Sequence, residues 1–416
     1  MSAPAGHTAP SGTPRPPRGR DRPRRTHGGP LGAPLATALA APGTDRIVYD
    51  LTGIQRQYDA LLGELPGTRV RFALKACPVD EVLHRLAECG AGFDAASPAE
   101  ITQALHAGAE PARIHYGNTV KSDQDIAAAH RLGVRTFATD SVEDVTAIAV
   151  HAPGARVFCR LATSGEGALW GLNRKFGCTP DDAVRVLATA RAAGLVPAGL
   201  SVHVGSQQMT AEGWRQALDT LAGTLTALAG RQIVPDHVNL GGGLPALGYL
   251  DRHGNPLEPP LDKILTVIRE GMERLGALTP SPLAFVMEPG RHLVADHGAV
   301  RARVSRLTRR RQPDGGEAHW LYLTCGKFNG LYEMDQVTHR LVFPGHPDAS
   351  DQVHAIVAGP TCDSDDAYGG GRYPVPVPRS VASGDPVWIL SAGAYATSYT
   401  TQGFNGVRPL PYVCVH

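Results

Sequence analysis

The sequence is dominated by a regular alternation between short apolar segments and longer amphipathic segments. Eight apolar segments lie between residues 70 and 287, with helix-like segments between them. A strand followed by a helix and another strand favours parallel pairing, and eight such units are typical of a closed (β/α)8 barrel. An open, doubly wound parallel sheet is the alternative. The predicted strands are residues 70–74, 92–94, 113–117, 134–138, 156–161, 199–204, 237–240 and 283–287.

The C-terminal part of the chain has a different pattern. From residue 298 onward, runs of β-branched residues alternate with Gly/Pro turns, which predicts an antiparallel β domain. A further predicted strand at residues 47–50 precedes the barrel and can pair into this domain. We therefore expect a TIM-like α/β barrel at residues 53–289 and a β domain formed by residues 43–52 and 290–416.

The first 42 residues are rich in Pro, Gly and Ala, and they contain six arginines between Arg15 and Arg25. A segment of this composition buries too little apolar surface to offset the entropy lost on folding. It also lacks the apolar stretch of a secretory signal. A disordered Pro/Arg/Gly-rich tail is therefore expected for residues 1–42.

Charge and cysteine content restrict the class of protein. The formal net charge is only +1, and no apolar run is long enough to span a bilayer, so neither nucleic acid nor a membrane is expected as a partner. The seven cysteines are scattered without a C-x-x-C pair, which predicts neither a disulfide framework nor a metal site. A reducing, cytoplasmic location is expected.

Polar residues or glycines follow nearly every predicted barrel strand. In such a barrel the active site forms at the carboxyl ends of the strands. Lys75 is the most informative, because an amine held away from water loses its proton more easily and can form a Schiff base with an aldehyde. A lysine that merely extends into solvent is the alternative for an isolated strand end. The residues at these ends are Lys75, Asp94, Asn118, Asp140, Arg160, His203, Gly241, Gly242, Gly243 and Glu288.

Two of these strand ends carry groups suited to an anion. Three successive glycines, Gly241, Gly242 and Gly243, allow backbone N–H groups to approach a phosphate closely. Their spacing does not match a dinucleotide fingerprint. Glu288 and Arg291 share one short turn, and a guanidinium matches two phosphate oxygens.

Taken together and in order, the motifs resemble those of the fold-type III pyridoxal-phosphate decarboxylases. This group contains the ornithine and diaminopimelate decarboxylases and has an alanine-racemase-like barrel with a β domain. The resemblance covers roughly residues 46 to 410 and is nearer to the ornithine-type branch. It is carried by motifs that begin at Phe72, Gly92, Tyr116, Arg160, Lys175, His203, Gly241, Glu288, Gly359, Gly393 and Phe404.

The resemblance implies a role for each residue around the cofactor, pyridoxal 5'-phosphate (PLP). Lys75 would hold PLP as an internal aldimine, His203 would stack on its ring, and Glu288 would keep the ring nitrogen protonated. Decarboxylation would then pass through a quinonoid and release CO2 and an amine. The implied cofactor-binding residues are Lys75, Asp94, Arg160, His203, Ser206, Gly241, Gly242, Gly243, Glu288, Gly290, Arg291 and Tyr395.

The resemblance also implies a homodimer with shared active sites. In this family the residues that correspond to Cys362 and Asp363 reach into the partner subunit's site, where Cys362 would protonate the substrate Cα. Cys362 would then join Lys75, His203 and Glu288 as a catalytic residue. The glycine-rich segment 163–171 suggests a mobile lid over the substrate.

The substrate implied is a basic, diamino amino acid similar to ornithine or lysine, as in polyamine biosynthesis. The segment that reads the substrate contains Tyr332, Glu333 and Asp335, and either carboxylate could bind a distal amine. Asp363 supplies another carboxylate. A diaminopimelate-type substrate, an amino acid tethered to a carrier protein, and a non-catalytic regulatory paralogue are alternatives. A racemase is disfavoured, because racemases of this fold place an arginine where this chain has Glu288.

Overall fold

The computed structural model describes residues 31–172 and 174–416 and contains a closed barrel beside a second sheet, also of eight strands. Eight parallel strands close the barrel in the order β10-β11-β2-β3-β4-β5-β6-β8. Closure occurs where β11 pairs with β2, Phe285 lying opposite Thr68. The predicted barrel is confirmed, and the open sheet is wrong. The strands are β2 (Thr68–Ala73), β3 (Gly92–Ala95), β4 (Ile114–Tyr116), β5 (Thr136–Thr139), β6 (Arg156–Arg160), β8 (Val196–Ser201), β10 (His237–Asn239) and β11 (Ala284–Met287).

Helices surround the barrel, and several begin at a side-chain cap that the sequence supplies. Ser97, Ser122, Ser141 and Thr179 each accept a hydrogen bond from the backbone N–H three residues later. A cap of this kind stabilises a helix by about 1 kcal/mol. The helices of the barrel are α2 (Leu51–Glu64), α3 (Asp80–Glu88), α4 (Pro98–His106), α5 (Asp123–Arg131), α6 (Val142–His151), α7 (Pro180–Ala192), α8 (Glu212–Ala229) and α9 (Leu261–Gly276).

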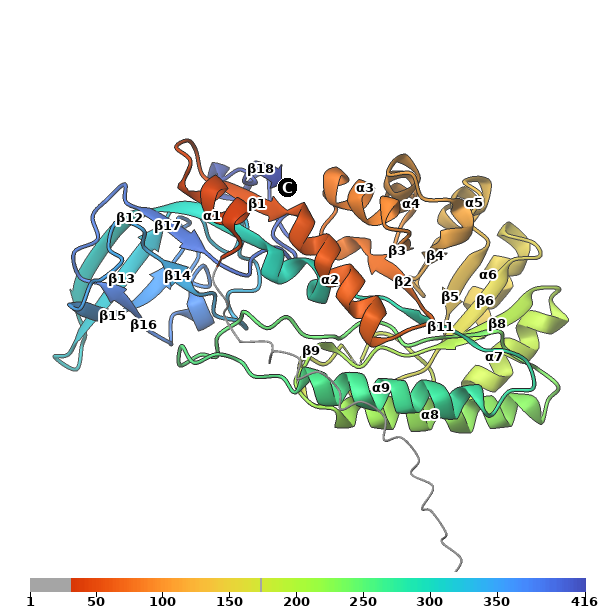
Figure 1. Cartoon of the computed structure of the whole chain (residues 1–416). Helices are drawn as coiled ribbons and strands as arrows, with labels where there is room; N and C mark the ends of the chain where they lie inside the picture. The colour runs from red at the N-terminus through yellow and green to blue at the C-terminus, as the bar shows by residue number, and fades with distance from the viewer. Residues whose placement is uncertain (1–30, 173) are drawn as a thin grey trace, which may run out of the picture.

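The second sheet lies beside the barrel, to the left in Figure 1. Most of its pairings are antiparallel, as predicted, but β1 pairs with β18 and β13 with β15 in parallel. β1 also pairs antiparallel with β12, so the segment before the barrel joins the sheet that follows it. The strands are β1 (Arg46–Asp50), β12 (Gly298–Arg311), β13 (Glu317–Leu323), β14 (Leu341–Val342), β15 (Gln352–Ala358), β16 (Val375–Pro378), β17 (Pro386–Ile389) and β18 (Tyr412–Val415).

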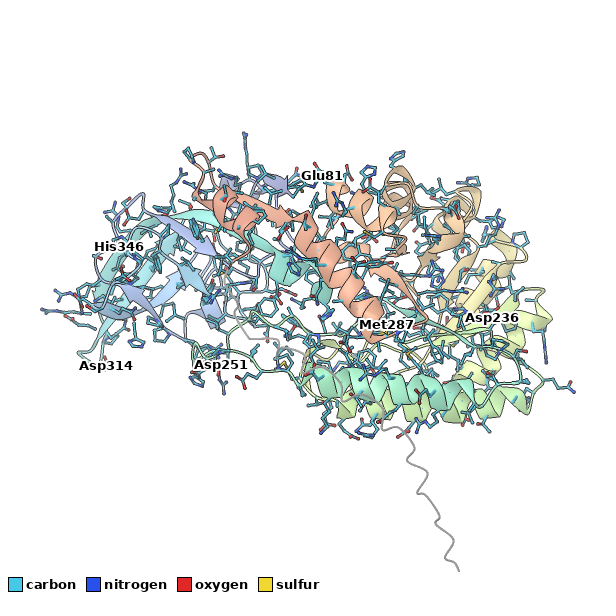
Figure 2. All side chains as sticks on the ribbon, in the orientation of Figure 1. Glu81, Asp236, Asp251, Met287, Asp314 and His346 are labelled. Atoms are coloured by element: carbon cyan, nitrogen blue, oxygen red, sulfur yellow. The ribbon has the colours of Figure 1, made fainter. Side chains whose placement is uncertain are left out.

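The carboxyl ends of the barrel strands face this second sheet. In Figure 2, Met287 at the end of β11 lies nearer the sheet than Asp236, which precedes β10. Backbone hydrogen bonds join the two parts, because the Tyr395 amide donates to the Ala76 carbonyl at 2.7 Å. One apolar core runs from the barrel helices into the sheet. The active-site end of the barrel is therefore covered by the β domain.

The N-terminal prediction is wrong for its last residues. Helix α1 (Ala33–Ala40) buries Leu35 and Leu39 against Val48, Ala299 and Leu390. These apolar contacts order a segment that composition alone marked as disordered. The arginine-rich stretch at residues 15–25 lies outside the described residues. Across residues 31–172 and 174–416, no helix is long and apolar enough to cross a bilayer.

Candidate active site

A cavity lies at the carboxyl ends of the barrel strands, where the sequence predicts an active site. The predicted cofactor-binding residues line this cavity, except Arg160 and Gly241. Two residues that the sequence analysis did not name, Ala73 and Leu244, complete its wall. Closure of the barrel brings together residues more than 200 positions apart in the chain, because it places the ends of β2 and β11 side by side, and the β domain adds Tyr395.

Lys75 lies one residue beyond the predicted strand, in the one-turn helix η1 (Leu74–Ala76). Its side chain is 49% exposed, and its Nζ lies 4.0 Å from Oδ2 of Asp94. The surrounding protein alone would lower the pKa of Lys75, but the charges of Asp94, Tyr395 and Glu288 outweigh that effect and raise it. The expectation that this amine loses its proton easily is therefore wrong, because these three neighbours favour its charged form.

Asp94 is buried at the end of β3 beside this amine. Its Oδ1 has no hydrogen-bond partner among the described residues. Burial raises the pKa of its carboxyl, although Lys75 and Arg160 oppose that change. Gly117 leaves the space in which this carboxylate lies, since a side chain at that position would overlap it. Asp94 is thus a buried acceptor aimed at the lysine and the cavity.

Glu288 follows β11 and is held by Asn239, a residue that the sequence analysis missed. The Asn239 amide donates to Oε1 of Glu288, and its Oδ1 accepts from the Gly241 backbone N–H at 2.8 Å. Burial and the Asp94 carboxylate raise the pKa of Glu288 to about 7. Asn239 lies in the predicted strand 237–240, just before the three glycines, and this position could have identified it as a site residue from the sequence.

This raised pKa predicts that the cofactor-free protein loses stability as the pH rises. The pKa in the folded state is about 7 and the ordinary value is 4.5, so between these values the folded protein keeps a proton that the unfolded chain releases. The stabilising contribution is complete below the ordinary value and is lost as the pH rises through about 7. Each tenfold difference in proton affinity between the folded and unfolded states contributes about 1.4 kcal/mol.

Urea unfolding of the cofactor-free protein at several pH values between 5 and 8 measures this contribution. The wild-type protein should lose more stability across this range than Glu288→Gln, which has no titrating group at that position. Comparing the two proteins cancels the histidines and other groups that titrate in both. Equal pH slopes would contradict the assignment.

His203 follows β8 and presents a neutral imidazole. Its Nδ1 accepts a hydrogen bond from the Gly205 backbone N–H at 3.1 Å, which leaves the proton of the neutral ring on Nε2. Burial, Arg160 and Lys75 hold the pKa of His203 well below its ordinary value. The Thr163 hydroxyl donates to the His203 carbonyl at 2.7 Å. A fixed, uncharged ring of this kind is suited to stacking on a flat cofactor.

Gly242 lies between His203 and Glu288, and we expect Gly242→Ala to weaken both PLP binding and the fold. An added Cβ would lie 2.8 Å from the Glu288 carbonyl oxygen and 3.2 Å from Nε2 of His203. Overpacking at such a site costs about 1–3 kcal/mol. Unfolding free energy and PLP affinity, read from fluorescence, measure the two effects.

Gly223 provides the matched control for that change. It is exposed within α8, and no atom lies within 4 Å of the position that its Cβ would take. Alanine there should stabilise the helix by roughly 0.5–1 kcal/mol and leave PLP affinity unchanged. A normal PLP affinity in Gly242→Ala would contradict the assignment of the glycines to the cofactor.

The opposite wall carries donors suited to a phosphate. Nε and Nη2 of Arg291 lie 3.3 and 3.2 Å from the Ser206 hydroxyl. Tyr395 has a φ of 62°, which is rare for an aromatic residue and marks backbone strain at this site. Its ring centroid lies 4.9 Å from Cζ of Arg291. Arg291 begins the short helix α10 (Arg291–Val294).

The predicted lid segment is attached to this wall by a two-stranded sheet. β7 (Ala168–Trp170) pairs antiparallel with β9 (Ser206–Gln208). The Trp170 ring lies 4.5 Å from Cζ of Arg291. The segment therefore covers the Arg291 side of the cavity, and its mobility stays a prediction.

Two further residues at the strand ends lie around the rim. Arg160 stacks over Phe176, with 4.9 Å between Cζ and the ring centroid. Burial lowers the pKa of Arg160, and the charges of Glu288 and Asp94 oppose that change. Ser141 caps α6, whereas Asp140 accepts a hydrogen bond from the Gly177 backbone N–H at 2.8 Å. Asp140 therefore fastens the segment that carries Phe176 to the barrel.

The predicted substrate residues divide into two groups. Glu333 lies against the cavity wall and pairs with Arg291, with Nη1–Oε2 and Nη2–Oε1 distances of 2.6 and 2.7 Å. Tyr332 is 45% exposed, and its ring lies 4.5 Å from that of Tyr399. Asp335 is exposed. Neither candidate for the distal amine lines the cavity itself, and Glu333 is the one that contacts its wall, through Arg291.

Cys362 and Asp363 are not brought to the cavity within one chain. They lie in the loop after β15, where Cys362 is exposed and its backbone N–H donates to Asn405 Oδ1 at 2.9 Å. They are absent from the cavity wall. Their predicted catalytic and binding roles therefore depend on a second subunit.

The residues present fit pyridoxal phosphate. Gly242 and Gly243 line the cavity at positions where a Cβ would overlap neighbouring atoms, and the donors suited to a phosphate come from Ser206, Arg291 and Tyr395. A lysine amine, a neutral histidine ring and a carboxylate whose charge depends on pH lie around the same space. The unpartnered Asp94 oxygen is a further acceptor.

Comparison with known proteins agrees with this interpretation. Residues 51–295 match the family model described as pyridoxal-dependent decarboxylase, pyridoxal binding domain. Lysine/ornithine decarboxylase of Selenomonas ruminantium is 29% identical over 374 residues, covering 89% of each chain. Diaminopimelate decarboxylase of Pseudomonas aeruginosa is 31% identical over 406 residues, again covering 89% of each.

A solved structure extends the likeness to most of the chain. The crystal structure of SrLDC in complex with PLP and cadaverine superposes with a TM-score of 0.78 at 26% identity, covering 91% of this chain and 92% of that chain. Because the family model, the fold and the residues around the cavity agree, the chain belongs to the pyridoxal-dependent decarboxylases.

Proposed function

We propose that this protein decarboxylates a free basic amino acid, with lysine and ornithine as the first candidates. The observation that carries this proposal is the arrangement of Lys75, Asp94 and Glu288 in one cavity of a PLP-dependent decarboxylase fold. A non-catalytic paralogue has no need to keep these groups together. The named relatives that act on lysine and ornithine support the same substrate class.

Each side chain has a physical task in this reaction. Pyridoxal phosphate, when bound, supplies an aldehyde that joins an amine and a ring that accepts the electron pair left by departing CO2. Lys75 provides the amine for attachment, and Oδ2 of Asp94, at 4.0 Å, can hold the proton that this amine gives up. The negative charge of Glu288 would keep a proton on the ring nitrogen when the cofactor is bound.

The remaining groups bind and shield. The neutral ring of His203 offers a flat apolar face. Gly242, Gly243, Ser206 and Tyr395 line the part of the cavity that suits the phosphate. Trp170 and the β7–β9 sheet cover the side nearest Arg291, which excludes water from that wall.

The substrate class follows from the charges beside the cavity. Glu333 is 12% exposed and paired with Arg291 at the cavity wall, and its carboxylate, once released from that pair, would repel a second substrate carboxylate. A distal ammonium is attracted to the same position. Diaminopimelate carries a second carboxylate as well as a second amine, so lysine and ornithine fit this wall better.

A substrate panel tests the proposal. Purified protein with PLP is given ornithine, lysine, arginine, diaminopimelate and 2,4-diaminobutyrate, and CO2 release is measured. Lysine or ornithine should give the highest kcat/KM. Activity confined to diaminopimelate, or to none of the five, would sink the assignment.

We also propose a homodimer that shares its active sites, in which Cys362 of one subunit serves the cavity of the other. The exposure of Cys362 and its absence from the cavity wall of its own chain support this arrangement. Its thiol would deliver the proton to the substrate Cα. Free thiols at all seven cysteines support a reducing, cytoplasmic location.

Mixing two inactive variants tests the shared site. Lys75→Ala and Cys362→Ala, each with little activity alone, should recover about a quarter of wild-type activity when their subunits exchange at equal amounts. Half of the dimers are then mixed, and each mixed dimer holds one intact site. Activity equal to the mean of the parents would show that each chain uses its own Cys362.

A further inference from the structure

Every N–H group of the Arg291 guanidinium is bonded to a neighbouring side chain. Arg291 is 4% exposed, and its guanidinium carries five N–H groups. Two of them bond to Glu333, two to the Ser206 hydroxyl and one to the Tyr249 hydroxyl at 2.9 Å. The Trp170 and Tyr395 rings cover it at 4.5 and 4.9 Å.

Glu333 is the strongest of these partners. Both of its oxygens bond to Arg291, at 2.6 and 2.7 Å, and the pair lies almost out of contact with water. A bidentate, charge-assisted pair is roughly twice as strong as neutral hydrogen bonds. The Ser206 and Tyr249 hydroxyls can rotate toward another acceptor, whereas the Glu333 carboxylate competes for the same N–H groups as an incoming oxyanion.

We propose that Glu333 and the phosphate of the cofactor compete for Arg291. Glu333 neutralises the guanidinium, and the phosphate must weaken or replace this pair when it binds. Glu333 holds the Nη1–Nη2 edge and Ser206 the Nε–Nη2 edge, so a phosphate that displaces the Ser206 hydroxyl would share Nη2 with Glu333. It would also lie beside the Glu333 carboxylate, which costs electrostatic energy in a buried site. Glu333 therefore sets how tightly this protein holds its cofactor.

The released carboxylate has a second consequence, which rests on the proposed function. The phosphate brings more negative charge than Arg291 can neutralise, and Glu333 adds to it. A substrate with a distal ammonium offsets this excess, so cofactor loading prepares the site for a cationic substrate. A neutral or acidic side chain would leave the excess unbalanced.

The experiment measures binding to the full-length protein after the cofactor has been removed. Inorganic phosphate and PLP are titrated against wild type and Glu333→Gln, with intrinsic fluorescence or calorimetry as the readout. Glutamine has nearly the same shape but no charge, so affinity for both ligands should rise about tenfold or more, equivalent to about 1.4 kcal/mol. Glu258→Gln is the control, since Glu258 is exposed and the same charge is removed.

The sign of the effect separates competition from a merely structural pair. If Glu333 only orients Arg291, its loss will weaken phosphate and PLP binding, and the proposal is overturned. An equal rise in Glu258→Gln would also overturn it, because the effect would then reflect net charge alone. A crystal structure of the wild-type holoenzyme gives a test without any variant: a Glu333 carboxylate still bonded through both oxygens to Arg291 would refute the exchange.

The substrate consequence has its own readout. In Glu333→Gln the KM for lysine or ornithine should rise by about tenfold or more, because the distal ammonium loses its counter-charge. An unchanged KM alongside tighter phosphate binding would remove Glu333 from substrate recognition while the competition stands. Failure of the proposed substrate class would instead appear in the wild-type substrate panel.

Discussion

Lys75→Ala is expected to abolish the covalent attachment of PLP and to lower kcat/KM for decarboxylation by roughly 10³- to 10⁴-fold. Lys75 is the lysine that lines the cavity, and its Nζ lies 4.0 Å from the Asp94 carboxylate that can take its proton. Losing a positioned amine removes both the covalent partner and a proton-transfer group, and each such loss is costly. Reduction with borohydride and peptide mass mapping should place the PLP adduct on Lys75.

Lys327→Ala is the matched control. Lys327 lies outside the cavity wall, with its Nζ 6.0 Å from the Tyr332 ring centroid. Its replacement should leave the adduct on Lys75 intact. A reducible adduct that persists in Lys75→Ala would show that another lysine carries the cofactor. Restoring the charge with Lys75→Arg should not rescue attachment, because a guanidinium stays protonated.

The barrel could be predicted because its signals are local. Each strand is a short apolar run, and each helix carries its own periodicity and, in several cases, its own cap. The predicted ends of the strands differ from the observed ends by a few residues at most, for example 70–74 against Thr68–Ala73. Strand β1 was also assigned correctly to the second sheet. Helix α1 was missed because two leucines in a Pro/Gly/Ala-rich stretch gain their stability only from distant partners.

The cavity wall could be predicted as well, because closure of the barrel places every strand end on one rim. The protonation of the ionisable groups in the cavity wall could not be predicted from the sequence. Lys75 was expected to lose its proton easily, but three neighbouring side chains from other strands and loops raise its pKa. The Arg291–Glu333 pair joins the segment after β11 to a turn of the β domain, and the spacing of the two residues in the sequence does not predict it. Tyr249 was missed for the same reason, whereas Asn239 could have been identified from its place directly before the glycines.

Glu288→Gln is expected to lower kcat by about 10²- to 10³-fold while PLP still attaches to Lys75. A glutamine amide has no negative charge to hold a proton on the ring nitrogen, so the ring accepts electrons less well when CO2 leaves. Steady-state kinetics and borohydride mapping separate the two effects. A normal kcat would contradict the role of Glu288, and a lost adduct would make it a binding residue instead.

Asn239→Ala tests whether the environment of Glu288 is as important as its charge. The Asn239 amide donates to Oε1 of Glu288 and thereby opposes the burial that raises the pKa of that carboxyl. Removing this donor should raise the pKa further, so the acidic limb of the kcat/KM profile should move to higher pH. A loss of packing alone would lower activity equally at all pH values. If Asn239 positions Glu288, its loss must change the protonation of that carboxylate. An acidic limb that stays in place would therefore show that Asn239 has a structural role only.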